Sequence, residues 1–217
     1  MVAIDPALAS RLDAGLRALG LDIPAAASEQ LLRYLEQLHK WNQAYNLSGI
    51  RKIQDMLDLH VLDSLSLLPF IDASPIADVG TGAGLPGIPL AICLPEKQFR
   101  LIDSNSKKTR FIFQTAALLG LRNVEVVHSR AEDYESNPRV AIVTSRAFAS
   151  LRDFVTRCDH MLATDGKFLA MKGLIPDDEI AELPVQYAVA AIHPLSLPGS
   201  AHVRHVLDIR RNSQALS

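Results

Sequence analysis

The chain has 217 residues, of which 48% are hydrophobic, and its formal net charge at pH 7 is −2. These values predict one folded domain with an appendage and a sizeable core, and they exclude a low-complexity chain. The two cysteines, Cys93 and Cys158, are far apart in the sequence and indicate neither a disulfide framework nor a zinc site, so we expect no metal. The sequence shows no export signal and no apolar stretch of about eighteen residues. We therefore expect a cytoplasmic protein with no membrane span.

Residues 1–70 are predicted to be helical, because their apolar side chains recur at helical spacing. Gly20 and the tetrapeptide Asn46-Leu-Ser-Gly interrupt the pattern. The expected helices span residues 8–19, 28–41, 53–60 and, from Asp63 to Pro69, a short apolar helix. We expect them to form a cap, residues 1–70, packed on a second unit, residues 71–217, in one compact molecule.

From residue 75 the pattern alternates between strand and helix. Strands are expected at residues 76–80, 99–103, 124–128, 140–145 and 167–172, and helices near 86–94, 107–119 and 150–162. Residues 186–193 and 202–210 predict an antiparallel pair at one sheet edge, joined by the hairpin-like loop Pro194-Leu-Ser-Leu-Pro-Gly. This order predicts an α/β fold of the class I (Rossmann-like) methyltransferase type, a seven-stranded, mostly parallel sheet with an antiparallel terminal strand.

The most informative segment is Asp78-Val-Gly-Thr-Gly-Ala-Gly-Leu-Pro-Gly, between the first strand and a helix in which Pro86 is expected at the first position. Its alternate glycines, Gly80, Gly82 and Gly84, would expose backbone N–H groups to a ligand. A GxGxxG pattern starting at Gly82 would suggest NAD or FAD, and no GxxxxGK[ST] P-loop occurs.

Two acids favour a different ligand. Asp78, at the strand end, is poorly placed for a pyrophosphate and well placed for a cationic amino-acid ligand, which favours S-adenosyl-L-methionine (AdoMet). Asp103 is expected at the carboxyl end of the next strand, where it could accept both ribose hydroxyls.

The basic residues are clustered. Residues 97–110 contain Lys97, Arg100, Lys107, Lys108 and Arg110 against Asp103, and the last stretch adds Arg204, Arg210 and Arg211. We expect both groups on the side of the strand carboxyl ends, as a patch that binds a polyanion. The alternative is an ordinary solvated face.

Several motifs occur together in a recognisable order: Trp41-Asn-x-x-x-Asn-Leu-Ser, His60-x-x-Asp63-Ser-Leu, the glycine loop, Asp103-Ser-x-x-Lys-Lys, Arg130-Ala-Glu132, Ser145-Arg146-Ala-Phe-Ala and Met171-Lys-Gly. Over about residues 30–210 the sequence resembles the RsmG (GidB) family of bacterial 16S rRNA guanine-N7 methyltransferases. It departs from that family mildly at Gly49 and Ala83.

The resemblance implies an AdoMet-dependent enzyme that methylates N7 of a guanine in 16S rRNA, nucleotide 527 of the 530 loop, with 16S rRNA or the small ribosomal subunit as its partner. Another RNA, a protein or a small molecule is the alternative substrate, and an NAD-dependent oxidoreductase is the alternative class. By resemblance the cofactor-binding residues are Asp78, Gly80, Gly82, Gly84, Leu85, Asp103, Ser104, Ala131, Glu132 and Arg146.

Within that set Ala131 and Glu132 should lie against the adenine, and Arg146 should face the methionine part and position the substrate. The RNA-binding residues would be Lys107, Lys108, Arg110 and Lys172.

Attack by guanine N7 requires no general base, because its lone pair is available in the ring plane. The sequence accordingly contains no evident Ser/His/Asp arrangement. Arg146 and the Asn42–Asn46 pair are our candidates for holding the guanine. We interpret His60 and Asp63, one helical turn apart, as a buried polar pair that ties the cap to the sheet, with an active-site element as the alternative. We interpret Trp41 as a core residue, with a base-stacking platform as the alternative.

Overall fold

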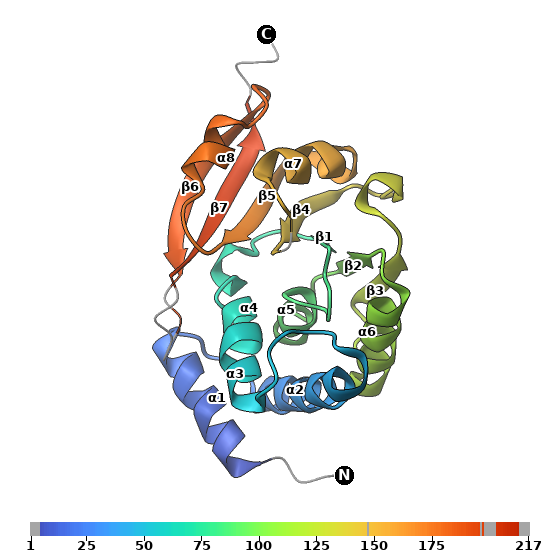
Figure 1. Cartoon of the computed structure of the whole chain (residues 1–217), viewed down its shortest axis with the longest axis vertical. Coiled ribbons are helices and arrows are strands. Elements are labelled where there is room, and N and C mark those ends of the chain that lie inside the picture. The colour runs from blue at the N-terminus through green and yellow to red at the C-terminus, as the bar shows by residue number, and fades with distance from the viewer. Residues whose placement is uncertain (1–4, 147, 196, 198–202, 213–217) are drawn as a thin grey trace.

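A seven-stranded sheet forms the centre of the molecule in the computed structural model, which describes residues 5–146, 148–195, 197 and 203–212. The strand order is β3-β2-β1-β4-β5-β7-β6. The bounds are β1 (Ile76–Val79), β2 (Phe99–Asp103), β3 (Val124–His128), β4 (Val140–Ser145), β5 (Leu162–Lys172), β6 (Tyr187–Leu195) and β7 (Arg204–Arg211). Strands β1 to β5 pair in parallel, and β7 is antiparallel to both of its neighbours, which confirms the predicted fold class (Figure 1).

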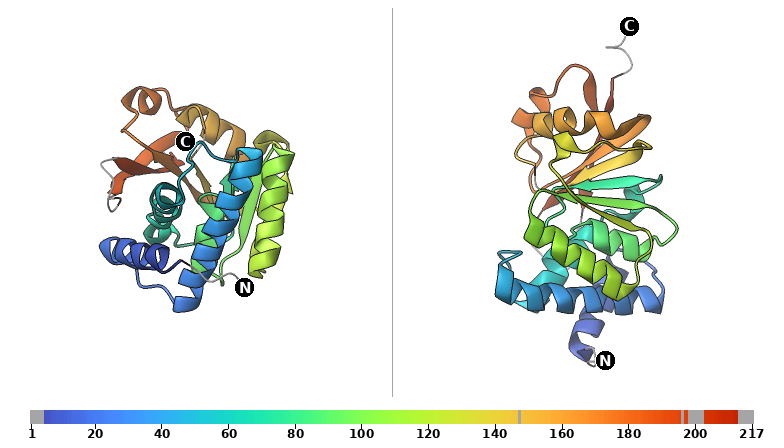
Figure 2. Two further views of the ribbon diagram at one scale, coloured as in Figure 1. Left: turned by 60° about the horizontal axis from the view of Figure 1, so that its bottom comes forward. Right: turned by 90° about the vertical axis from the view of Figure 1, so that its right-hand side faces the viewer.

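Helices cover both faces of this sheet (Figures 1 and 2). On one face lie α5 (Gly87–Cys93) and α6 (Ser106–Leu119), and on the other lie α7 (Leu151–Cys158) and the short α8 (Asp177–Ala181). Each face has its own buried apolar cluster, one containing Ile88 and Phe111, the other containing Phe154 and Phe168. Both faces of the parallel strands are therefore shielded from water, as such strands require.

The N-terminal helices pack outside α5 and α6. They are α1 (Pro6–Ala18), α2 (Ala25–Tyr45), α3 (Ile53–Met56), the π-helix η1 (Leu57–Leu62), α4 (Asp63–Leu65) and the 3₁₀ turn η2 (Leu68–Phe70). Leu31 and Leu35 of α2 belong to the same buried cluster as Ile88 and Phe111, so the residues expected to form a cap share a core with the sheet. The division at residue 70 stays a prediction.

Four local expectations need correction. Asp63 does not begin a helix, because Leu62 before it keeps right-handed helical dihedrals and residues 53–65 form one continuous helical run. Helix α2 begins at Ala25, directly after Pro24, rather than at Ser28. Strand β5 begins at Leu162 instead of residue 167. Pro86 is the N-cap of α5, so the first helical residue is Gly87.

The expected hairpin-like loop at 194–199 is only partly described. Pro194 and Leu195 belong to β6, whereas residues 196, 198 and 199 lie outside the described part of the chain. Within the described residues no helix is long and apolar enough to cross a membrane, and no group of three or more His, Cys, Asp and Glu side chains is arranged to hold a metal ion.

Candidate functional site

The glycine loop after β1 has the backbone that its sequence predicts. Gly80, Gly82 and Gly84 have φ angles of 67°, 63° and 86°, in the left-handed region that residues with a Cβ rarely adopt. The loop is anchored to the neighbouring strand, because the N–H groups of Gly80 and Thr81 donate to the carbonyl of Ile102 at 2.9 and 3.2 Å. Backbone without bulky side chains thus lies at the carboxyl edge of β1 and β2.

Asp78 supports this loop from beneath. Its side chain is fully buried, and Oδ2 accepts hydrogen bonds from the Thr81 hydroxyl at 2.6 Å and from the Gly87 N–H at 2.8 Å. Burial raises the pKa of this carboxyl to about 6. A Cβ at Gly87 would lie 2.9 Å from the carboxylate and would clash with Leu101, so glycine lets α5 start this close to the strand. Asp78 lines neither cavity described below.

A cavity of about 390 Å³, the second cavity, lies over the carboxyl ends of β1 and β2. Five of the expected cofactor residues line it, namely Gly80, Asp103, Ser104, Ala131 and Glu132. Asp103 accepts hydrogen bonds from the Gly82 N–H at 2.9 Å and from the Asn105 N–H at 2.8 Å. Each carboxylate oxygen keeps a second lone pair, so Asp103 can still accept from a ligand's hydroxyls.

A larger cavity of about 520 Å³, the first cavity, adjoins the second. The two cavities share Gly80, Lys108 and Phe148. The first cavity is enclosed by the loop after α2, by the helical run 53–65, and by residues that follow β1, β4 and β5. Gly82, Leu85, Arg146 and Lys172 of the expected site line it. The site therefore consists of two chambers that meet at the glycine loop.

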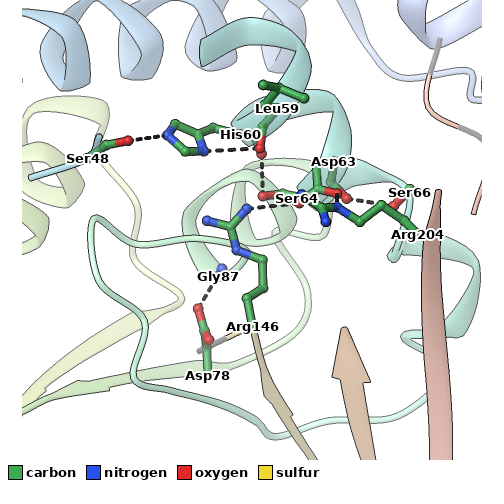
Figure 3. Close-up of polar contacts among 10 residues, drawn as sticks. All are labelled: Ser48, Leu59, His60, Asp63, Ser64, Ser66, Asp78, Gly87, Arg146 and Arg204. Carbon is green, nitrogen blue, oxygen red and sulfur yellow. Dashed lines mark hydrogen bonds and ion pairs between the residues drawn. The ribbon is translucent and has the colours of Figure 1, made fainter. Parts of the chain in front are cut away.

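Asp63 is a buried carboxylate that holds two arginines in the first cavity (Figure 3). Its Oδ2 accepts from Arg146 Nη1 at 2.9 Å, and its Oδ1 accepts from Arg204 Nε at 3.2 Å. Arg146 follows β4 and Arg204 begins β7, so Asp63 connects the helical run to two parts of the sheet. The expected tie between helices and sheet is present, with these arginines as the partners of Asp63.

His60 and Asp63 are both buried, as expected, but the hydrogen bonds of His60 are not made to Asp63. His60 instead makes a hydrogen bond of 2.7 Å between its Nε2 and the Ser48 hydroxyl (Figure 3). Burial, aided by the positive charge of Arg146, lowers the pKa of His60 to about 4, so the ring is neutral at physiological pH. His60 and Ser48 both line the first cavity, where they offer polar groups without net charge.

The Asn42–Asn46 pair does not face either cavity. Asn42 is buried, and its side chain donates to the Ile50 carbonyl at 2.8 Å and accepts from the Ser48 N–H at 2.7 Å, so it shapes the loop after α2. Asn46 is the left-handed C-cap of α2. Trp41 packs against Tyr45 and Phe111, with ring centroids 5.0 and 5.5 Å apart, as its interpretation as a core residue requires.

The basic residues do not form one patch. Lys107, Lys108 and Arg110 occupy the start of α6 beside the cavities, and Lys108 lines both. Lys97 and Arg100 lie at the opposite end of β2, where Arg100 donates to the Pro138 carbonyl. Arg211 likewise donates to carbonyl oxygens of residues 162 and 163, at the start of β5. Residues at the amino ends and at the carboxyl ends of parallel strands lie on opposite sides of the molecule, so these basic residues form separate groups.

Lys172 lines the first cavity but is paired with Glu179, whose Oε2 lies 2.8 Å from its Nζ. Glu132 of the second cavity is similarly close to Arg157, at 3.3 Å.

Sequence reasoning missed two features of the site. One is Phe148, which lines both cavities, and the other is the ion pair between Arg204 and Asp63. The motif Ser145-Arg146-Ala-Phe was the sequence signal that could have pointed to Phe148. Asp63 and Arg204 are 141 positions apart, and no local sequence pattern connects them.

Comparisons with known proteins match most of this chain to one family and to one fold. A family model described as GidB, rRNA small subunit methyltransferase G, matches residues 27–207. The ribosomal RNA small subunit methyltransferase G of Marinobacter nauticus is 48% identical over 206 residues, which cover 95% of this chain and 96% of the relative.

Solved structures share the fold. The ribosomal protein L11 methylase from Lactobacillus delbrueckii subsp. bulgaricus has a TM-score of 0.54 at 17% identity, covering 76% of this chain and 81% of the other. A SAM-dependent methyltransferase from Thiobacillus denitrificans, in complex with S-adenosyl-L-homocysteine, has a TM-score of 0.50 at 13% identity, with coverages of 69% and 91%. At these identities the likeness concerns the fold.

Proposed function

Because this chain belongs to the GidB family, rRNA small subunit methyltransferase G, we propose that it transfers the methyl group of AdoMet to N7 of a guanine in 16S rRNA. The observation that carries the proposal is the pair of cavities that meet at Gly80. A two-substrate transfer needs a cofactor chamber and an acceptor chamber open to one another. Nucleotide 527 of the 530 loop is the target implied by family resemblance.

The second cavity suits AdoMet chemically. Asp103 offers lone pairs to ribose hydroxyls, and the apolar side chains of Ile102 and Ala131 line the walls that an adenine would contact. The glycine loop removes side chains at the junction, so the methionine part can lie close to the first cavity. When bound, AdoMet supplies a methyl group activated by its sulfonium charge.

The first cavity suits a guanine that has been turned out of its RNA strand. N7 lies in the deep major groove of an A-form helix, which side chains do not reach, so the target has to be single-stranded or flipped. With AdoMet bound in the second cavity, the N7 lone pair would form the new N–C bond as the C–S bond breaks, and the positive charge would pass from sulfur to the purine. No proton is transferred, and the neutral His60 and Ser48 need supply no base.

Catalysis by this site is therefore a matter of positioning the two reactants in line. Arg146, Arg204 and Lys108 in the first cavity would contact RNA phosphate or stack on a base, because the transition state develops no new anion for them to stabilise. Lys107 and Arg110, which lie beside Lys108 in the first five residues of α6, would extend this cationic surface. The ammonium group of Lys172 is paired with the Glu179 carboxylate, so Lys172 would attract RNA phosphate less strongly than an unpaired lysine.

The experiment uses the purified protein with AdoMet labelled in the methyl group. Naked 16S rRNA and small ribosomal subunits, both from cells that lack the gene, are the acceptors, and binding of NADH is measured in parallel. We expect methyl transfer to at least one RNA acceptor and no specific binding of NADH. Transfer to protein alone, or to neither acceptor, would refute the proposed function.

A further inference from the structure

Asp63 and its two arginines form a cluster whose carboxylate is concealed and whose cations face the cavity. The Asp63 side chain is 3% exposed, against 23% for Arg146 and 33% for Arg204. The carboxylate comes from the helical run 53–65, whereas the arginines come from the ends of two sheet strands. In Figure 3 both arginines extend toward Asp63 from different ribbons.

Each arginine uses only part of its guanidinium in this contact. Arg146 donates through Nη1 and Arg204 through Nε, so other N–H groups of the same fork remain for a ligand. A guanidinium held in one orientation before the ligand arrives loses less rotamer freedom on binding. The carboxylate lines the cavity with only 3% of its side chain exposed, so its main effect on the cavity is the orientation of the two arginines.

We propose that Asp63 is a positioning residue for the methyl-transfer reaction: it fixes Arg146 and Arg204 in the orientation that aligns the RNA target. This inference rests on the function proposed above and adds to it a role for the helical segment. Asp63 acts through the two arginines, because each of its oxygens accepts from one of them and its side chain is only 3% exposed.

Electrostatics gives the inference a distinctive signature. Asp63 places a negative charge behind a surface that binds a polyanion, so replacing it with a neutral residue strengthens the overall attraction to RNA. A residue that served only as a counter-charge would therefore leave methyl transfer unchanged, or improve it at limiting RNA. A positioning residue gives the opposite result, in which RNA binding is retained and the transfer step slows.

The test is the single-turnover rate of methyl transfer by Asp63→Asn, with saturating enzyme and AdoMet, together with RNA affinity measured by fluorescence anisotropy. We expect the rate to fall about ten- to a hundredfold, because small displacements of a positioning group have effects of that size. RNA affinity should be equal or higher, and AdoMet affinity should stay within about twofold of wild type. An unchanged rate would overturn the inference, and so would an RNA or AdoMet affinity that falls in proportion to the rate.

Asp58→Asn is the matched control. Asp58 lies in η1 of the same helical run and forms an ion pair with Arg11 of α1, away from both cavities. This variant removes the same charge from the same run, and we expect a wild-type rate. If both variants slow transfer equally, the effect belongs to the stability of the run and the inference fails.

A second readout needs no RNA and separates this inference from the proposed function. The Arg204 Nε–H donates to Asp63, so its NMR signal should exchange slowly with water in the wild type and rapidly in Asp63→Ala, which removes both acceptor oxygens. A wild-type protein that shows this ordering but transfers no methyl to RNA would refute the function alone. Rapid exchange already in the wild type would refute the positioning role.

Discussion

At the scale of single residues, three aspartates at the carboxyl edge of the sheet have three different tasks. Asp78 is sealed beneath the glycine loop, Asp103 faces the second cavity, and Asp63 restrains arginines in the first. Their chemistry is the same, so the difference comes from what surrounds each carboxylate. Of the three, only Asp103 both accepts from two backbone N–H groups and lines the second cavity.

Replacing Asp103 tests its expected role with the ribose. Asp103→Asn keeps the shape of the side chain but removes the charge that strengthens its hydrogen bonds. We expect the dissociation constant for AdoMet to rise about ten- to a hundredfold, corresponding to about 1.5–3 kcal/mol. Calorimetry measures this directly, with Asp153→Asn as the control, because Asp153 lines the same cavity and is half exposed. Equal affinities of the Asp103 variant and the wild type would place the ribose elsewhere.

His60 should make the stability of the protein depend on pH. Its folded-state pKa of about 4 is below the ordinary value of 6.5, so the unfolded chain binds the proton more readily. The stability contributed by the neutral ring is present above pH 6.5 and is lost as the pH falls toward 4.

Urea unfolding of the wild type and of His60→Gln at pH 7.5 and at pH 4.5 checks this. The difference in unfolding free energy between the two proteins should shift against the wild type at the lower pH, by about 2–3 kcal/mol. A difference that is the same at both pH values would show that burial does not disfavour the charged ring.

At the scale of elements, the sequence predicted what local patterns determine. Alternating glycines defined the loop, Gly20 and Asn46 marked helix ends, and the apolar runs located the five parallel strands. Contacts between distant elements left no local pattern. The contacts of Arg211 with residues 162 and 163 are of this kind. The position of Arg100 at the start of β2, by contrast, followed from the predicted strand 99–103, and the prediction of a single basic patch overlooked it.

One such contact joins α2 to the glycine loop. Tyr34 is fully buried, and its hydroxyl donates to the Ala83 carbonyl at 2.8 Å. The hydrogen bond links the N-terminal helices to the loop expected to hold the cofactor. Nothing in the sequence distinguished Tyr34 from the leucines that share its helix, because its position fits an apolar face equally well.

Tyr34→Phe tests whether α2 supports cofactor binding. The variant leaves the Ala83 carbonyl buried without its donor, so we expect a loss of about 1–2 kcal/mol in unfolding free energy and a several-fold weaker affinity for AdoMet. Urea unfolding and calorimetry give the two values. Tyr45→Phe, at the exposed end of the same helix, should change neither. Wild-type AdoMet affinity in Tyr34→Phe would mean that the loop is held by the sheet alone.

At the scale of the whole molecule, the helices and the sheet share one site. The N-terminal segment supplies Ser48, His60 and Asp63 to the first cavity, and the strand ends supply Arg146 and Arg204. The second cavity is built from the sheet side alone. Under the proposed function, the cofactor would bind in the second cavity and the RNA target in the first, which the N-terminal segment completes.

The measurement that tests this account most directly is mass mapping of small-subunit rRNA from cells with and without the gene. We predict that one guanine-containing fragment gains a single methyl group only when the gene is present, and that the modified nucleotide shows the strand scission typical of N7-methylguanine after borohydride and aniline treatment. Identical maps from the two strains, or a methyl group on a different atom, would contradict the account.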